Sequence, residues 1–177
     1  MSTINLEDKN IYTIIGLITI SFSRLEGLAL DYVSILSSGF PSVENRMICQ
    51  DFTLEKKLQT LENLIKLKHN GPFEKLQLEL VNRIKELKDE RNLFIHGFWE
   101  MQDLENMDKI EYLTVKKFKY KLETPQNSVF IKIWNTGDIK KISKKELIDY
   151  FKNLQKTEIE LIDVMNENVK IFGDTIK

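Results

Sequence analysis

The chain has 177 residues, with 26 basic and 27 acidic side chains and a net charge of −1, so no field of the whole chain attracts a polyanion. A chain of this length buries roughly 70% of its unfolded surface, and its single cysteine, Cys49, excludes an internal disulfide. We therefore expect one domain over residues 1–177 in the cytoplasm, with no signal peptide, membrane span, metal or cofactor.

The first predicted element is a long helix from Asn5, its expected cap, to about Ser38. Its inward residues keep helical spacing: Ile11, Ile14, Ile18, Phe22, Leu25, Tyr32 and Leu36. Glu26 lies beside this row and has two interpretations. It is the partner of an interior arginine, or it is a solvated acid paired with Arg24 or a neighbouring lysine.

Two more helices follow, from Thr53 to Lys68 and from Phe73 to Gly97. The turn between them is short, which predicts antiparallel neighbours, and we expect its His69 to be solvated. The later helix carries a continuous seam with alternating steps of four and three residues: Phe73, Gln77, Leu80, Ile84, Leu87, Arg91, Phe94 and Phe98.

After this seam the apolar period changes to two, which predicts an antiparallel hairpin or three-stranded meander over about residues 98–141. Between residues 114 and 145 there are nine lysines and only two acids. One interpretation is a patch that gathers RNA phosphates, with Tyr120, Trp134 or Trp99 available for stacking. The other is a solvated face whose lysines discourage edge pairing.

The last helix begins with a capping box, Ser143 and Glu146, next to a hydrophobic staple between Ile142 and Leu147. Its apolar spacing continues to about Phe172. The predicted fold is therefore mainly α, an antiparallel four-helix bundle with a small antiparallel β-hairpin or meander inserted between the third and fourth helices.

Arg91 interrupts the apolar seam of the third long helix. A buried guanidinium costs several kcal/mol unless it is paired or reaches a cleft. Asn92 follows it, and His96 lies four residues further on, on nearly the same helix face as Asn92. A cation, an orienting amide and a titratable imidazole suit the chemistry of a phosphodiester. The alternative is an interfacial Arg91 paired with an acid and His96 as a C-terminal capping residue.

The run from Arg91 to Gly97 resembles the Arg-x4-6-His motif, with Asn after Arg, of the HEPN superfamily. These are small helical proteins, many of them metal-independent ribonucleases in toxin–antitoxin and antiphage systems. The resemblance implies an RNA substrate and catalytic roles for Arg91, Asn92 and His96, to which we add Glu26 as a supporting acid. It implies attack of the 2′-hydroxyl on the adjacent phosphorus, which leaves a 2′,3′-cyclic phosphate.

On a straight helix Arg91 and His96 point roughly 140° apart. They meet at one phosphate only if the helix unwinds before Gly97 or if another subunit completes the site. HEPN proteins commonly form two-fold dimers with facing motifs, so we expect a homodimer with a composite active site. Some HEPN toxins carry a Tyr two residues after the His, where an antitoxin attaches AMP. This chain has Phe98 there, which excludes that modification but leaves an antitoxin partner open.

Three functions follow from these residues. The first is a HEPN-type endoribonuclease, a toxin or antiphage effector. The second is a non-catalytic HEPN-like dimer that binds a protein or RNA partner and keeps Arg91 and His96 as structural polar groups. The third is a helical adaptor unrelated to the family. RNA cleavage in EDTA that His96→Ala and Arg91→Ala abolish would separate the first from the others.

Overall fold

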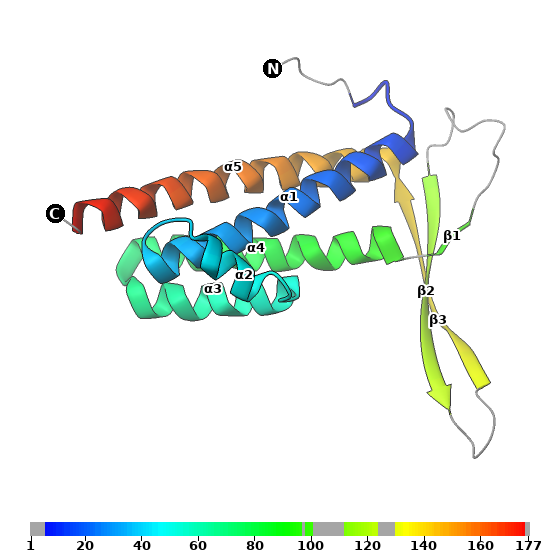
Figure 1. Ribbon diagram of the computed structural model, residues 1–177. Coiled ribbons are helices and arrows are strands. Elements are labelled where there is room, and N and C mark those ends of the chain that lie inside the picture. Colours follow the sequence, from blue (N-terminus) through cyan, green and yellow to red (C-terminus); the bar gives the residue numbers. More distant parts are fainter. Residues whose placement is uncertain (1–5, 97, 101–111, 124–129, 176–177) are drawn as a thin grey trace. The chain divides into compact units, whose positions relative to one another are not determined.

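The computed structural model describes residues 6–96, 98–100, 112–123 and 130–175, with side chains at 6–92 and 142–172. These residues are mainly helical, as predicted. They form five helices and three strands (Figure 1): α1 Ile11–Ser38, α2 Val43–Cys49, α3 Leu54–Lys68, α4 Gly71–His96, β1 Phe98–Glu100, β2 Tyr112–Glu123, β3 Phe130–Ser143 and α5 Lys144–Thr175.

The chain divides into two compact units. The sheet unit consists of Met1–Thr19 and Asp89–Phe151. The helical unit consists of Ile20–Lys88 and Lys152–Lys177. Helices α1, α4 and α5 contribute residues to both units.

The sheet unit contains a three-stranded antiparallel sheet in the order β1-β2-β3. The short strand β1 pairs with the first half of β2, and β2 pairs with β3 along its whole length. The register of β2 and β3 shifts between Lys116 and Phe118, as in a β-bulge, which increases the local twist of a strand pair. The sheet precedes α5 directly, because β3 ends at Ser143 and α5 begins at Lys144.

The predicted capping box of α5 is confirmed. The Ser143 backbone N–H donates to Glu146 Oε2 at 2.7 Å, and the Glu146 N–H donates to Ser143 Oγ at 3.1 Å. Ile142 and Leu147, the predicted staple, are both buried. These contacts satisfy two amide donors at the start of α5 that have no partner within the helix.

Helix α1 begins later than predicted. Asn10 caps it, because the Thr13 N–H donates to Asn10 Oδ1 at 2.8 Å, and the helix begins at Ile11. The predicted start at Asn5 was therefore wrong, and Asn5 itself lies outside the described residues. The error has a physical cause: asparagine caps helices well at either position, and the apolar spacing begins only at Ile11.

Helix α1 is also long and apolar enough, by length and composition, to cross a membrane. The core helix of a soluble protein passes the same test. Within the sheet unit, Ile11, Ile14 and Ile18 of this helix are completely buried. These three residues of the predicted core row are therefore buried, as expected for a helix that packs against other parts of a protein.

The core of the helical unit comes from four helices. Its fully buried residues include Leu25, Tyr32, Leu58, Leu61, Ile65, Ile84, Leu154 and Leu161. Ion pairs link α3 to α4: Lys85 Nζ lies 2.8 Å from Glu62 Oε1, and Lys88 pairs with Glu55. The later α4 residue meets the earlier α3 residue, so the two helices run antiparallel, as predicted, and Figure 1 shows them side by side.

A polar network lies inside this apolar core. The hydroxyl of Tyr32 donates to Gln77 Oε1 and accepts from Asn168 Nδ2 at 3.0 Å. Asn168 Nδ2 also donates to the carbonyl of Val164 at 2.8 Å. All three side chains are completely buried, and burial raises the pKa of Tyr32 far above its usual range. The network therefore joins α1, α4 and α5 through groups that water does not reach.

His69, expected to be solvated, is half-buried instead. Its ring packs edge-on against Phe73 with centroids 5.4 Å apart, and it lies 6.2 Å from the ring of Phe172. Its Nε2 atom is buried. Burial lowers the pKa of His69, and the neighbouring Asn168 side chain acts in the opposite direction. A turn residue gives no periodic pattern, so its packing against α5 was not predictable from spacing.

The described residues form five helices where four were predicted, because α2 was missed. Ser42 caps it by accepting from the Asn45 N–H at 3.3 Å. Three of its seven residues are exposed and apolar: Val43, Met47 and Ile48. A helix that is so short and exposes its apolar side chains lacks the buried stripe by which sequence patterns identify helices.

Candidate functional site

The middle of the predicted α4 seam is buried, whereas Phe73 is half-buried and the side chains of Phe94 and Phe98 lie outside what the structure describes. Gln77, Leu80, Ile84 and Leu87 are between 0% and 3% exposed. Arg91, one turn further on, is half-buried. Arg91 belongs to the sheet unit, whereas the fully buried part of the seam belongs to the helical unit.

Arg91 and Asn92 contact each other. Arg91 Nη1 donates to Asn92 Oδ1 at 3.2 Å, and both residues are half-buried. This contact occupies one oxygen lone pair of the amide and leaves its Nδ2 group available as a donor. Arg91 takes part in a further interaction besides this bond, and a guanidinium, with its five N–H donors, can bind more than one partner.

The backbone of α4 is helical through His96. Its side chain, and all of Gly97, lie outside what the structure describes. The five-residue step from Arg91 to His96 on a regular helix is a rotation of roughly 140° and a rise of about 7.5 Å. Unwinding before Gly97, one of the two routes that would bring them together, is therefore not observed. The composite site across two chains remains a prediction.

Tyr150 is a neighbour of Arg91 that the sequence did not identify. It is on the first turns of α5 and is 5% exposed. Burial raises the pKa of Tyr150 far above its usual range, the charge of Glu90 raises it further, and the charge of Arg91 lowers it. At neutral pH this side chain is a protonated phenol, which can donate a hydrogen bond. Its spacing of three residues from Leu147 was the available signal.

Glu26 pairs with a lysine of α3. Lys57 Nζ donates to Glu26 Oε1 at 3.0 Å, and the lysine side chain is only 7% exposed. A buried ammonium needs such a partner, because an isolated charge in the core is strongly destabilising. This agrees with the second interpretation of Glu26, an acid paired with a lysine. Its role beside Arg91 or His96 stays a prediction.

The lysine-rich segment lies mainly in β2 and β3, where the structure describes the backbone and the register but not the side chains. Tyr120 is in β2, Trp134 is in β3, and Trp99 is in the neighbouring strand β1. Lys121 is the register partner of Lys132, and Lys119 that of Trp134. Whether these residues bind RNA stays a prediction.

A buried acid also lies in the helical unit. The side chain of Glu158 is 7% exposed, and its ion pair with Arg24 spans 4.0 Å. Its Oε1 atom has no hydrogen-bond partner among the described residues. Burial raises the pKa of Glu158, and the charge of Arg24 offsets part of this effect. Such a weakly paired carboxylate destabilises the fold when it is ionised.

The described side chains contain no cluster of three or more His, Cys, Asp or Glu residues that could hold a metal ion. No protein-family model, curated protein or solved structure matches the chain. The candidate site is therefore argued from its own residues, Arg91, Asn92 and Tyr150, with His96 at the end of the same helix.

Proposed function

We propose that the chain is a metal-independent endoribonuclease of HEPN type, a cytoplasmic toxin or antiphage effector. The observation that supports this best is the contact between Arg91 and Asn92 on a helix that continues to His96. The finer fold proposal is an antiparallel HEPN-like bundle with a β insertion between α4 and α5.

Each residue of the motif has a chemical task. The 2′-oxygen of the RNA attacks phosphorus, the bond from phosphorus to the 5′-oxygen breaks, and the 2′-hydroxyl proton passes to water. Protonated His96 donates a proton to the departing 5′-oxygen and is recharged from water. Arg91 binds the pentavalent phosphate through its guanidinium, whose charge does not depend on pH. Asn92 Oδ1 keeps a second lone pair, so it accepts from a ring N–H of the protonated imidazole one turn further along the helix and orients it.

We further propose that the site is composite and forms in a homodimer. In this arrangement Arg91 of one chain and His96 of the other act on one phosphate, since a single α4 separates them by roughly 140°. The protonated phenol of Tyr150 is an uncharged, buried side chain within reach of the charge of Arg91, on the phosphate side of the site.

The register of β2 and β3 supports RNA as the substrate. Directly paired and alternate residues share a face of a sheet, so Lys119, Lys121, Lys132 and Trp134 fall on one face of this ladder. Like charges directly opposite each other destabilise a sheet, as at the pair of Lys121 and Lys132. RNA phosphates would relieve that repulsion, and the indole could stack on a base.

The first experiment is RNA cleavage by the purified full chain in EDTA. We expect products with 2′,3′-cyclic phosphate ends. His96→Ala should lower the rate roughly 10²–10⁴-fold by removing the proton donor. Arg91→Ala should lower it roughly 10²–10³-fold by removing charge stabilisation. The matched control is Arg46→Ala, because Arg46 pairs with Asp31 in the helical unit, is not part of the motif and should be dispensable.

The second experiment tests the composite site by mixing the two inactive variants. A mixed dimer of Arg91→Ala and His96→Ala chains has one intact arginine facing one intact histidine. Half of randomly mixed dimers are of this kind, each with one of two sites restored, so we expect roughly a quarter of the native rate. If the mixture stays inactive although the chains form dimers, the two residues do not act across the interface.

The second candidate function is a non-catalytic dimeric binding module. The contact of Arg91 with Asn92 also favours this candidate, because it gives the guanidinium a structural partner in its own chain. Equal background cleavage by the native chain, Arg91→Ala and His96→Ala would favour it over the enzyme. Loss of RNA binding in Lys121→Glu and Lys132→Glu variants would then identify RNA, rather than a protein, as the ligand.

A further inference from the structure

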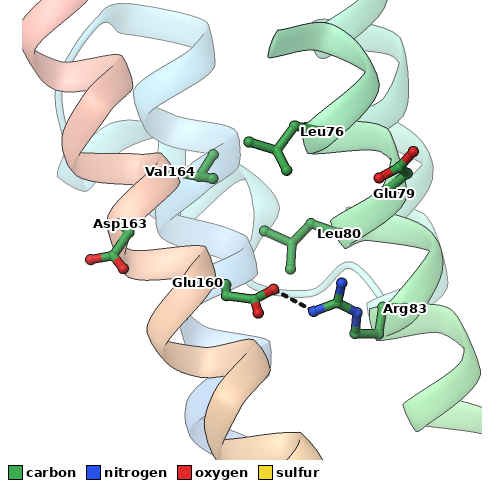
Figure 2. Close-up of a pocket in the computed structure, with 7 residues that line it drawn as sticks. All are labelled: Leu76, Glu79, Leu80, Arg83, Glu160, Asp163 and Val164. Carbon is green, nitrogen blue, oxygen red and sulfur yellow. Dashed lines mark hydrogen bonds and ion pairs between the residues drawn. The ribbon is translucent and has the colours of Figure 1, made fainter. Parts of the chain in front are cut away.

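The helical unit has an open groove between α4 and α5, the α4–α5 groove. Its lining residues are Leu76, Glu79, Leu80, Arg83, Glu160, Asp163 and Val164. Figure 2 shows Leu76 and Leu80 pointing from α4 toward α5, with Val164 opposite them. Leu76 is 52% exposed, so apolar surface extends from the floor of the groove to its rim.

The size of the groove indicates the kind of ligand. Its volume is about 190 Å³. Sites for drug-sized molecules occupy roughly 300–1,000 Å³ and enclose most of the ligand. A groove between two helices that is smaller than this can instead accept a protruding side chain from a third helix, as in helix-in-groove recognition. The geometry therefore favours a protein partner that inserts one apolar side chain.

The charges of the groove indicate the sign of the partner. Arg83 and Glu160 form an ion pair at one end (Figure 2), and Lys156 Nζ lies 3.7 Å from the other oxygen of Glu160. Glu79 and Asp163 are exposed and have no ion-pair partner among the described residues. Two uncompensated carboxylates, one on each helix, thus border the apolar floor. They repel an acidic partner and attract a basic one.

We propose that the α4–α5 groove binds a helix of a partner protein that carries an apolar side chain flanked by lysine or arginine. The apolar side chain fills the space over Leu76, Leu80 and Val164. The flanking cations reach Glu79 on one side and Asp163 on the other. This site is independent of ribonuclease activity, because none of its residues belongs to the Arg91 motif.

The test uses the full chain and a fluorescein-labelled peptide helix of about 18 residues, which makes about five turns. Leucines line one face of this peptide and lysines border that face; a matched peptide has glutamate in place of every lysine. We expect micromolar binding of the lysine peptide by fluorescence anisotropy and at least tenfold weaker binding of the glutamate peptide.

Variants then locate the binding site. Leu76→Asp should weaken binding of the lysine peptide at least tenfold, and the double change Glu79→Lys with Asp163→Lys should do the same. These side chains are on the surface, and circular dichroism should report an unchanged fold. Asp51→Lys, an exposed acid before α3, is the control for charge and should leave affinity unchanged.

Two results would overturn the proposal. One is equal binding of both peptides, or binding that the groove variants do not change, because the attraction would then lie elsewhere. The other is self-association of the native chain that Leu76→Asp abolishes, measured by sedimentation, with no detectable binding of the lysine peptide. The groove would then be covered by a second copy of the chain.

Discussion

The buried hydroxyl of Tyr32 gives the most direct test of the helical core. Tyr32→Phe removes one oxygen atom and two hydrogen bonds, to Gln77 and from Asn168. Two net hydrogen bonds contribute about 2 kcal/mol, and a buried polar group left without a partner costs a further 1–3 kcal/mol or so. Asn168 keeps its bond to the carbonyl of Val164. Gln77 Oε1 loses the donor of its hydrogen bond, and Gln77 Nε2 already lacks a partner among the described residues.

We therefore expect Tyr32→Phe to lower the free energy of unfolding by about 3–5 kcal/mol, and Tm by roughly 6–20 °C in a chain of this size. Urea unfolding followed by circular dichroism measures the first quantity. Tyr12→Phe is the matched control, because Tyr12 is only half-buried, and it should change stability by less than about 0.5 kcal/mol.

The double variant of Tyr32→Phe and Gln77→Leu should recover part of the loss, because it removes the amide that the single change strands. A loss below about 1 kcal/mol in Tyr32→Phe, or strict additivity in the double variant, would refute the claim that these side chains act as one desolvated network.

Three further predictions concern single side chains. Ser143→Ala should cost about 1 kcal/mol in urea unfolding by breaking the capping box, whereas Lys145→Ala should cost nothing measurable. Burial lowers the pKa of His69, so below about pH 6.5 the unfolded chain binds more protons than the fold. Stability should therefore fall as the pH decreases through that value, and His69→Phe should flatten this slope. Burial raises the pKa of Glu158, so the fold keeps a proton above pH 4.5. Stability should fall as the pH rises from there, less steeply in Glu158→Gln.

The spacing of residues in the sequence predicted the features that depend on one helix face or on one helix end. The α4 seam from Gln77 to Leu87 and the cap of α5 at Ser143 follow from helical periodicity and from the local chemistry of a helix start, both of which a sequence contains. Both features are local, since the residues involved lie within a few turns of one another along one helix. The mainly helical class follows from the same kind of pattern.

Spacing did not predict which side chains meet across helices. The spacing places Glu26 beside the buried row of α1, and Glu26 is half-buried there. Its partner Lys57 lies 31 positions away on α3, and only the packing of the two helices brings the two side chains together. Tyr150 was missed for the same reason, since only the fold brings it within reach of the charge of Arg91. The sequence of one helix shows on which face a residue lies, whereas the partner of that residue depends on how two helices pack together.

The continuous helical backbone of α4 also determines what a catalytic Arg91 requires. Because the backbone is helical through His96, position 96 lies roughly 140° around the helix axis from position 91, the position that would bind the phosphate. A two-fold interface places residue i of one chain against residue j of the other and the reverse, so a second α4 can bring its own His96 to the first Arg91. The proposed ribonuclease therefore requires a dimer, because one α4 does not bring Arg91 and His96 of the same chain to one phosphate.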